Sequence, residues 1–388
     1  MLVIEKYLGV LRGHFPTQVS AIQNLVGNRA VTFVTGRHCE LSLHDSSTHS
    51  PVLSTRKEIK ATPEQAVNHD FQSMSGVLTS EKMQHEPIFY VTAGAHDLRV
   101  ALRLVSSLSL PQKIYMRVLR EREIIQLNDD ERAALKSAIA AERIILLTET
   151  ESLAAQFRTC YDLKVHETTL CLPCSVFPGQ SANLPSVPRS KAHCFRVGLL
   201  GEWRAEKGVD MLPQLIRHLR YVLDAADDAP KVKLIIQKPP PKKSLKSIKK
   251  SVIRDYLFWH SVGFPIPDKR LSLSFRTTKM SKEEFLTTLM SVDLLLLPYR
   301  LNDYRHRGSG ILLDGVAARK PIVYTRGMGM SEFLRHGNAE AASENPKDYA
   351  DKVVRILSDI EIYRTAADQA AVEFKRRIER IALLLQSI

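Results

Sequence analysis

Two short segments of the chain combine cations with glycines where a strand-like run leads into a helix-like run. In the first, LLGEWRAEKGVDMLPQLI at 199–216, Arg204 and Lys207 follow Gly201 and stand three residues apart. Two cations so placed on a strand-to-helix loop can reach a diphosphate together, and glycine lets an anion come close to the backbone. The spacing is neither a Walker loop nor a GxGxxG motif. The competing interpretation is a solvated surface loop, because arginines and lysines near a helix start are usually exposed.

The second segment, YRHRGSGILLDGVAARKPIVYT at 304–325, sets Arg305 and Arg307 beside a Gly-Ser-Gly corner. An apolar helix-like run begins at that corner, and a helix start offers unpaired N–H groups with a partial positive charge. Arginine adds a fork of donors that suits phosphate. These features predict an anion cradle that includes Ser309 and Gly310. An ordinary loop-to-helix corner with exposed arginines fits the local pattern equally well.

The chain that must position these loops has 388 residues, enough for two domains. Its 44% hydrophobic and 25% charged residues are typical of soluble globular proteins. No apolar run of about 18 residues is present and the start MLVIEKYLGV lacks the features of a signal peptide, so we expect a cytoplasmic protein. The net charge of +13 favours an anionic partner: nucleic acid, an acidic membrane surface or a phosphorylated small molecule.

The five cysteines predict no disulfide framework and fit a reducing compartment. Cys171 and Cys174 form a CxxC pair, but no second CxxC or HxxxH completes a zinc site, and SVFPG follows instead of a helix. We therefore expect both to be structural or linker cysteines, and we expect no metal site.

Short β-branched or aromatic runs alternate with longer amphipathic runs along the first half of the chain. The strand-like runs are 30–36, 88–94, 113–118 and 143–149, and the helix-like runs are 16–27, 97–108 and 129–142. Such alternation indicates β-α units on a parallel sheet. The stretch CSVFPGQSANLPSVPRSKAH at 174–193 is rich in Pro and Ser and is typical of a linker.

The same alternation restarts after the linker. Strand-like runs are 195–202, 231–238, 293–299 and 321–325, and helix-like runs are 208–226, 281–292, 310–320 and 345–359. The fold class is therefore α/β, with two Rossmann-like doubly wound domains facing a cleft. Ligands of such sheets bind at the carboxyl ends of the strands, so the cleft is the expected site. We expect a first domain at 1–175, a linker at 176–194, a second domain at 195–365 and a final helix at 366–388.

The order of four motifs in the second half resembles the donor domain of GT-B glycosyltransferases, in particular the retaining family 4 type. The motifs are GEWRAEKG, SKEEFLTTLMSVDLLLLPY, RGSGILLDGVAARKPIVYT and GNAEAASENPKDYADKV, within Phe195–Leu357. The resemblance implies that Arg204 and Lys207 hold the donor diphosphate, with Gly201 on the same loop. A nucleotide-sugar, of UDP or GDP type, would be a substrate, and no separate cofactor is expected.

The anion cradle departs from the family pattern at the E-x7-E motif. Asp314 takes the place of the second glutamate, which in the family bonds the ribose, and His306 takes the place of the first. Arg307, Ser309 and Gly310 resemble the R-x-S-G variant of some relatives, in which phosphate contacts come from this corner. The departure puts the identity of the sugar in question rather than the fold.

The first half resembles the acceptor domain of these enzymes more weakly. In EKYLGVLRGHFPTQVSAIQNL at 5–25, Gly13 and His14 fall where relatives have a flexible loop near the acceptor. In TAGAHDLRVALRL, His96 and Asp97 follow a strand-like run. His96 is a candidate to bond the transferred sugar or the acceptor. The alternative is a helix-capping corner with Asp97 as N-cap.

The resemblance implies retaining, metal-independent transfer of a sugar to a glycan or lipid-linked acceptor, in polysaccharide or glycoconjugate assembly. No D-x-D of the metal-dependent kind is found. One alternative is a sugar-nucleotide 2-epimerase on the same fold. The other is a non-catalytic protein that binds nucleic acid or an anionic surface, although the cations are dispersed and no RNA-binding motif is present.

Three further segments carry expectations about partners. The base of the donor is expected near SFRTTKM at 274–280. The basic loop KPPPKKSLKSIKK at 238–250 is either an anionic-membrane contact at the inner face of the membrane or a plain solvated insertion. EFKRRIERIALLLQSI at 373–388 is either an interfacial helix or the helix that crosses back to the first domain, and we favour the second.

Overall fold

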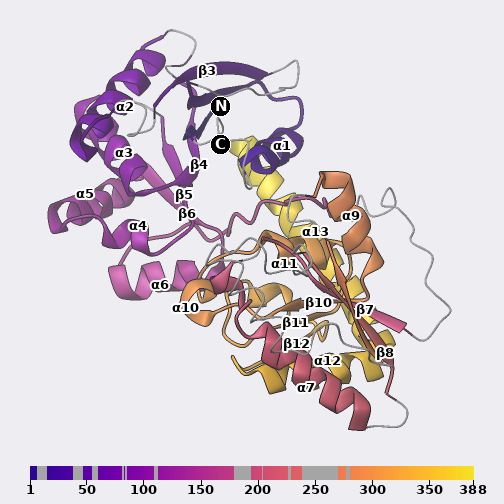
Figure 1. Cartoon of the computed structure of the whole chain (residues 1–388). Helices are drawn as coiled ribbons and strands as arrows, with labels where there is room; N and C mark the ends of the chain where they lie inside the picture. Colours follow the sequence, from indigo (N-terminus) through magenta and orange to yellow (C-terminus); the bar gives the residue numbers. More distant parts are fainter. Residues whose placement is uncertain are drawn as a thin grey trace, which may run out of the picture. The chain divides into compact units, whose positions relative to one another are not determined.

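The chain forms two compact units, each built on its own sheet (Figure 1). The computed structural model describes residues 1–6, 15–37, 47–54, 60–80, 83, 85–108, 112–178, 194–202, 204–225, 229–237, 270–276 and 280–388. Unit 1 comprises Met1–Cys174, His306–Gly308 and Arg377–Ile388, and unit 2 comprises Ser175–Arg305 and Ser309–Arg376.

The sheet of unit 1 has six parallel strands in the order β3-β2-β1-β4-β5-β6. The strands are β1 (Leu2–Glu5), β2 (Val31–Gly36), β3 (Ser47–Leu53), β4 (Ile88–Ala93), β5 (Ile114–Val118) and β6 (Ile144–Thr148). Except at the edge strand β3, their residues are mostly buried on both faces of the sheet. Continuous apolar strands are typical of parallel sheets because helices cover both faces.

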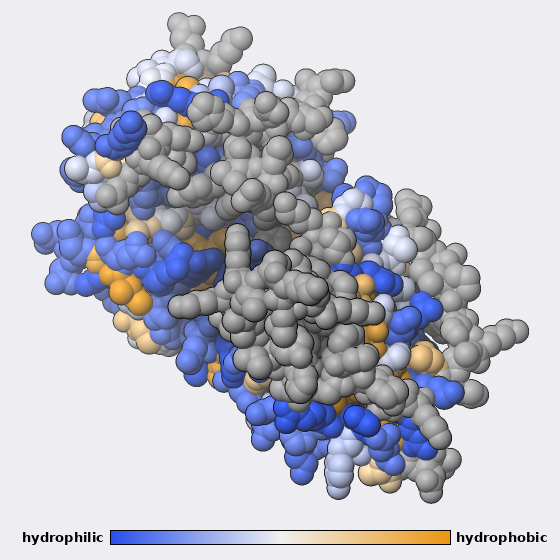
Figure 2. All heavy atoms as spheres, in the orientation of Figure 1, coloured by the Kyte–Doolittle hydropathy of each residue, from blue (hydrophilic) through white to orange (hydrophobic). Residues whose placement is uncertain are grey.

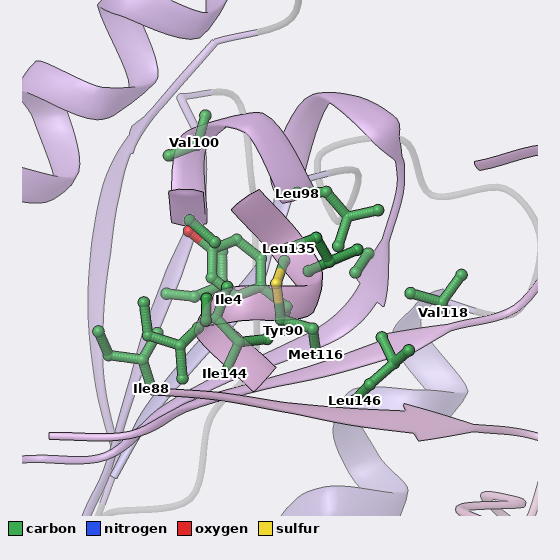
Figure 3. Close-up of a cluster of buried hydrophobic side chains, with 14 of the residues drawn as sticks. Ile4, Ile88, Tyr90, Leu98, Val100, Met116, Val118, Leu135, Ile144 and Leu146 are labelled. Atoms are coloured by element: carbon green, nitrogen blue, oxygen red, sulfur yellow. The ribbon is translucent and has the colours of Figure 1, made fainter. Parts of the chain in front are cut away.

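The helices of unit 1 are α1 (Phe15–Val26), α2 (Pro63–Leu78), α3 (Ala95–Ser107), α4 (Arg122–Ile125), α5 (Asp129–Ala140) and α6 (Glu151–Tyr161). Side chains of α2, α3, α5 and α6 form one hydrophobic cluster with the strands, and Figure 3 shows Tyr90 inside it beside Ile4 and Ile88. The starts of α2 and α5 are fixed by capping boxes, Thr62 with Gln65 and Asn128 with Glu131.

Unit 2 repeats this architecture with six parallel strands in the order β12-β11-β10-β7-β8-β9. The strands are β7 (Cys194–Leu199), β8 (Lys231–Ile236), β9 (Leu271–Phe275), β10 (Leu294–Leu297), β11 (Ile322–Thr325) and β12 (Ala339–Ala342). The helices are α7 (Leu212–Ala225), α9 (Lys282–Ser291), α10 (Leu301–Tyr304), α11 (Gly310–Ala317), α12 (Pro346–Ser358) and α13 (Ile360–Ser387), with 3-10 turns η3 (Ala205–Lys207) and η4 (Ser331–Phe333). The core of one face joins α7 and α12 to the strands.

The end of α13 belongs to unit 1, although the helix begins in unit 2. Within unit 1, Arg29 Nη1 donates to the carbonyl of Gln386 at 3.0 Å, and Gln386 Nε2 donates to the carbonyl of Leu25 at 3.0 Å. Arg377 Nη2 lies 2.7 Å from Glu151 Oε1. The end of the helix is therefore tied to α1 and to the start of α6 by polar contacts.

Each sheet has one topological switch point, where successive connections leave in opposite directions. In unit 1 the chain runs from β1 to β2 and β3 on one side, then returns to β4 on the other side of β1. In unit 2 the corresponding switch point lies between β7 and β10. A crevice forms beyond the carboxyl ends of the two strands at such a point, because their loops diverge. The structure therefore marks two candidate ligand positions, one for each unit.

The predicted α/β class and two doubly wound halves are confirmed, and the predicted strand and helix runs in both halves correspond to observed elements. The runs given in the sequence analysis include none for β1, β3, β9, β12, α2, α4, α6 or α10. Three of these missed elements are the edge strands β3, β9 and β12. In the view of Figure 2 most of the described surface is hydrophilic, with small apolar patches.

Candidate functional site

The loop after β7 carries three of the predicted donor-site residues at the switch point of unit 2. Gly201 has φ +104°, and a Cβ there would lie 2.6 Å from Lys207 Nζ. The ammonium of Lys207 therefore lies directly against the backbone of Gly201, which only a glycine permits. Arg204 precedes η3, and Lys207 ends it. The structure thus brings Gly201 and Lys207 into contact, with Arg204 on the same loop.

Arg204 is flanked by carboxylates of its own loop. Its Nη2 lies 2.7 Å from Glu202 Oε2, and its Nη1 lies 3.2 Å from Glu206 Oε1. The side chains of Arg204 and Glu202 are 39% and 68% exposed, so both remain accessible to solvent. Exposed ion pairs contribute little free energy. A phosphate could therefore replace Glu202 as the partner of Arg204 at small cost.

The loop after β10 packs on the loop after β7. Gly208 has φ +72°, and a Cβ there would lie 1.8 Å from the carbonyl oxygen of Pro298. Arg300 N donates to the carbonyl of Glu206 at 2.9 Å. A backbone hydrogen bond and a backbone contact thus fix the two switch-point loops relative to each other, and the second contact requires glycine at 208.

The predicted anion cradle is divided between the two units. Ser309 and Gly310 start α11 in unit 2, whereas Arg307 belongs to unit 1. Ser309 is 6% exposed, and its Oγ accepts a hydrogen bond from Leu312 N at 3.3 Å as the N-cap of α11. Its own N–H points at Met330 Sδ, 3.2 Å away. In this structure the hydroxyl of Ser309 stabilises the helix start.

The anion that comes close to Gly308 is a carboxylate of the protein. A Cβ at position 308 would lie 2.1 Å from Glu149 Oε2, and Thr150 Oγ1 donates to the carbonyl of His306 at 2.8 Å. Glu149 is in turn bound by Arg117 Nη2 at 3.0 Å, and Arg117 is fully buried. Gly308, the first glycine of the Gly-Ser-Gly corner, therefore has a close contact within unit 1.

Asp314 is buried in unit 2. The family pattern assigns it to the ribose of the donor, but it is 2% exposed, and its Oδ1 accepts hydrogen bonds from Ser175 N at 2.7 Å and Val176 N at 2.8 Å. Burial raises the pKa of Asp314 to about 7, although the two backbone donors act in the opposite direction. The carboxyl anchors the first residues of unit 2, and its contact with the ribose of the donor stays a prediction.

His96 lies at the switch point of unit 1, in the first turn of α3. Its Nε2 is 2.8 Å from Asp70 Oδ2, and its side chain is 25% exposed. Lys6, directly after β1, places its Nζ 2.5 Å from the same carboxylate oxygen and 3.1 Å from His96 Nε2. Loops from the ends of β1 and β4 thus meet over one buried aspartate of α2, and the sequence analysis named neither Lys6 nor Asp70.

Asp70 is held by donors on both oxygens. His69 Nδ1 lies 3.1 Å from Oδ1, and Ser54 N donates to the same oxygen at 3.4 Å. Burial alone would raise the pKa of the Asp70 carboxyl, but His96, Lys6 and His69 lower it to about 2. The carboxylate therefore stays charged at neutral pH and fixes the orientation of the His96 ring.

Asp97 is not the N-cap of α3, as the alternative interpretation of this corner expected. The N-cap is Gly94, and Asp97 at the third helical position accepts a hydrogen bond from Gly94 N at 2.9 Å through Oδ2. The carboxylate still satisfies a backbone donor at the helix start, so the corner combines helix capping with an accessible imidazole.

Several predicted positions fall outside the described residues: Gly13, His14, the basic loop 238–250 and residues 277–279 of the expected base site. Among the residues that are described, no cluster of histidine, cysteine and acidic side chains could hold a metal ion, and no helix is long and apolar enough to cross a membrane. A cavity of about 600 Å³ lies in unit 2 between α9 and the sheet, with Arg276 and Met280 in its wall.

Comparison with known proteins identifies the fold. No family model and no curated protein matches the chain. A structure described as trehalose-6-phosphate from E. coli bound with UDP-2-fluoro glucose shares 10% sequence identity with this chain. The superposition has a TM-score of 0.68 and covers 100% of this chain and 99% of that chain. WaaG, a glycosyltransferase involved in lipopolysaccharide biosynthesis, shares 14% identity, with TM-score 0.62 over 100% of both chains.

A putative UDP-N-acetylglucosamine 2-epimerase from Listeria monocytogenes is also similar, at 11% identity and TM-score 0.50, with 94% of this chain and 89% of that chain covered. At such identities the likeness concerns the fold alone. With two Rossmann-like units of six parallel strands each, the chain has the GT-B fold of glycosyltransferases.

Proposed function

We propose that the protein is a glycosyltransferase that moves a sugar from a nucleotide-diphosphate donor to a glycan or lipid-linked acceptor. The observation that carries this proposal is the loop after β7, where Arg204 and Lys207 stand at the switch point of unit 2. Two cations beside a glycine backbone at this place suit the diphosphate of a nucleotide-sugar. The likeness to a protein bound with UDP-2-fluoro glucose supports the same ligand class.

The chemistry would be electrostatic. As the sugar-phosphate bond breaks, negative charge grows on the departing diphosphate, and fixed cations that meet it lower the barrier. Arg204 and Lys207 would supply this stabilisation, together with Arg307. His96 would hydrogen-bond the transferred sugar or the acceptor through the ring nitrogen that Asp70 does not occupy. We propose a retaining, metal-independent reaction, because the cations of the chain already supply the charge that a metal would bring.

The finer points of the proposal concern the donor base and the setting. Arg276 and Met280, which belong to the expected base segment 274–280, line one cavity of unit 2 and leave room for a base of UDP or GDP. We place the enzyme in the cytoplasm, in polysaccharide or glycoconjugate assembly, where a basic protein with net charge +13 would also contact an anionic membrane surface.

Calorimetric titration with UDP, GDP and ADP tests the donor site. The wild-type protein should bind one of them, and the double variant Arg204→Ala, Lys207→Ala should lose binding and turnover while it stays folded. The matched control is Arg217→Ala, Arg220→Ala, which removes two exposed cations with the same spacing from α7. Wild-type affinity in the first double variant would refute the site.

A 2-epimerase is the second candidate, because the fold is shared with the Listeria protein. An epimerase would convert its nucleotide-sugar without an acceptor, so analysis of the products separates the two activities. The same titrations should include a short RNA. Binding of RNA alone, with a steep salt dependence, would leave the basic surface as the function instead.

A further inference from the structure

Tyr299 is a buried aromatic residue between the parts of the candidate donor site. It follows β10 at the switch point of unit 2 and is 2% exposed. The carbonyl of Tyr299 accepts a hydrogen bond from Thr325 Oγ1 at 2.5 Å, and the same hydroxyl lies 2.6 Å from Tyr349 Oη. The backbone of Tyr299 is thus anchored to β11 and through it to α12.

The face of the Tyr299 ring is directed at the ammonium of Lys207. The Nζ atom lies 5.7 Å from the ring centroid, within the range of a cation–π contact. Because the same Nζ lies against the backbone of Gly201, the ammonium is held between the ring and the loop. A lysine has a flexible stem of four carbons, so these contacts select among its many side-chain conformations.

The ring itself is fixed by its neighbours. The ring of Tyr304, 3% exposed, packs on it with a centroid separation of 4.4 Å and an interplanar angle of 40°. The Tyr299 hydroxyl lies 3.4 Å from Ser309 Oγ, the N-cap of α11. One side chain therefore contacts both the lysine of the β7 loop and the start of α11.

We propose that Tyr299 is a positioning residue for the donor diphosphate: it holds the Lys207 ammonium where the phosphates bind and joins that loop to the first turn of α11. The inference rests on the proposed function. Its physical basis is preorganisation, since a lysine that is already ordered loses less conformational entropy when a phosphate binds. A tyrosine that only fills the core would not affect phosphate affinity through Lys207.

A double-mutant cycle with UDP as the probe separates these roles. We expect Tyr299→Leu to weaken UDP binding about fivefold, within the range of a cation–π contact. In the Lys207→Ala background the same substitution should change the dissociation constant by less than about twofold, because its partner is gone. Equal weakening in both backgrounds would overturn the inference.

A shape-preserving series guards against a Leu variant that fails to fold. Tyr299→Phe keeps the ring and removes the hydroxyl, and a trifluorinated phenylalanine at position 299 keeps the shape but weakens the negative ring face. We expect the fluorinated protein to bind UDP about threefold more weakly than Tyr299→Phe. The control is the same pair of substitutions, phenylalanine and trifluorinated phenylalanine, at Tyr221, which is 74% exposed. Equal affinities of the two position-299 proteins would contradict the inference.

The outcomes also distinguish this inference from the function on which it rests. If wild-type protein binds UDP, GDP or ADP and the changes at position 299 have no effect through Lys207, the inference alone fails. If wild-type protein binds none of the three, the proposed function fails, and the role of Tyr299 in donor binding fails with it.

Discussion

The charged side chains at the two switch points differ in how deeply they are buried. In unit 1, the side chains of Lys6 and Asp70 are 5% and 3% exposed and neutralise each other beneath His96. In unit 2, Arg204 is 39% exposed and pairs with surface glutamates. Buried partners are exchanged only at a large free-energy cost, whereas exposed partners are exchanged easily. The first arrangement therefore orients one imidazole, and the second keeps its cations available to an incoming anion.

Two buried aspartates show the same contrast. Asp70 accepts from Lys6, His96 and His69, and its pKa falls to about 2. Asp314 accepts from two backbone N–H groups, and burial raises its pKa to about 7. Burial opposes the charge of both carboxyls, so the difference comes from the cationic and imidazole donors around Asp70. Three predictions test the two units, from the largest expected effect to the smallest.

The largest effect should come from Asp70→Asn. The variant leaves Lys6 as a buried ammonium without its counter-charge, and breaking one partner of a buried pair costs about 3–5 kcal/mol. We expect the free energy of unfolding of unit 1 to fall by that amount in urea denaturation. The control Asp129→Asn, whose side chain is 95% exposed, should stay within about 0.5 kcal/mol of wild type. A stable Asp70→Asn protein would show that the pair is not needed for the fold.

In unit 2 the substitution that we expect to destabilise the fold acts on a backbone contact. Gly208→Ala places a Cβ against the carbonyl of Pro298 at φ +72°, so the loop must move, and we expect a loss of about 3 kcal/mol. Gly327→Ala is the comparison, because φ there is +83° but a Cβ would meet no atom closer than 3.5 Å. Thermal denaturation should rank Gly208→Ala well below Gly327→Ala, and equal midpoints would contradict this account.

The loop after β7 shows what sequence predicts well. Its cations, glycines and flanking apolar runs are contiguous, so the order of strand, loop and helix could be predicted from one segment. The site in unit 1 could be predicted only in part. His96 was found because it follows a strand, but Lys6 and Asp70 are 64 residues apart and meet only through the packing of α2. The capping box of Thr62 and Gln65 with Pro63 was a signal that could have located α2.

The role of Asp314 shows the limit of a motif. The pattern placed a carboxylate on the correct helix, but burial and the positions of two distant N–H groups determine what that carboxylate binds. Tyr299 was missed for a similar reason: an apolar run that ends in tyrosine predicts core packing, and the contact with Lys207 exists only in three dimensions. Spacing predicts which elements form, whereas side-chain partners depend on packing between them.

The smallest of the three effects concerns the pH dependence of Asp314. A carboxyl whose pKa rises on folding stabilises the folded state at pH values below its unfolded pKa of about 4, and this contribution is lost as pH rises through about 7. Linkage limits the loss to about 4 kcal/mol, and we expect roughly half of it because the surroundings relax around a buried charge. Asp70 has the opposite sign: its stabilisation is complete above about pH 4 and disappears as pH falls through about 2.

Asp314→Asn isolates the contribution of the carboxyl charge to stability. The amide oxygen can still accept hydrogen bonds from Ser175 N and Val176 N, while the charge is removed. We expect the variant to match wild type below about pH 4 and to be more stable by about 2 kcal/mol at pH 8, as measured by urea denaturation at each pH. The difference between the two proteins is the relevant quantity, since other titrating groups cancel in it. A variant that is less stable than wild type at pH 8 would mean that the ionised carboxylate has a cationic partner, and the contrast with Asp70 would then be wrong.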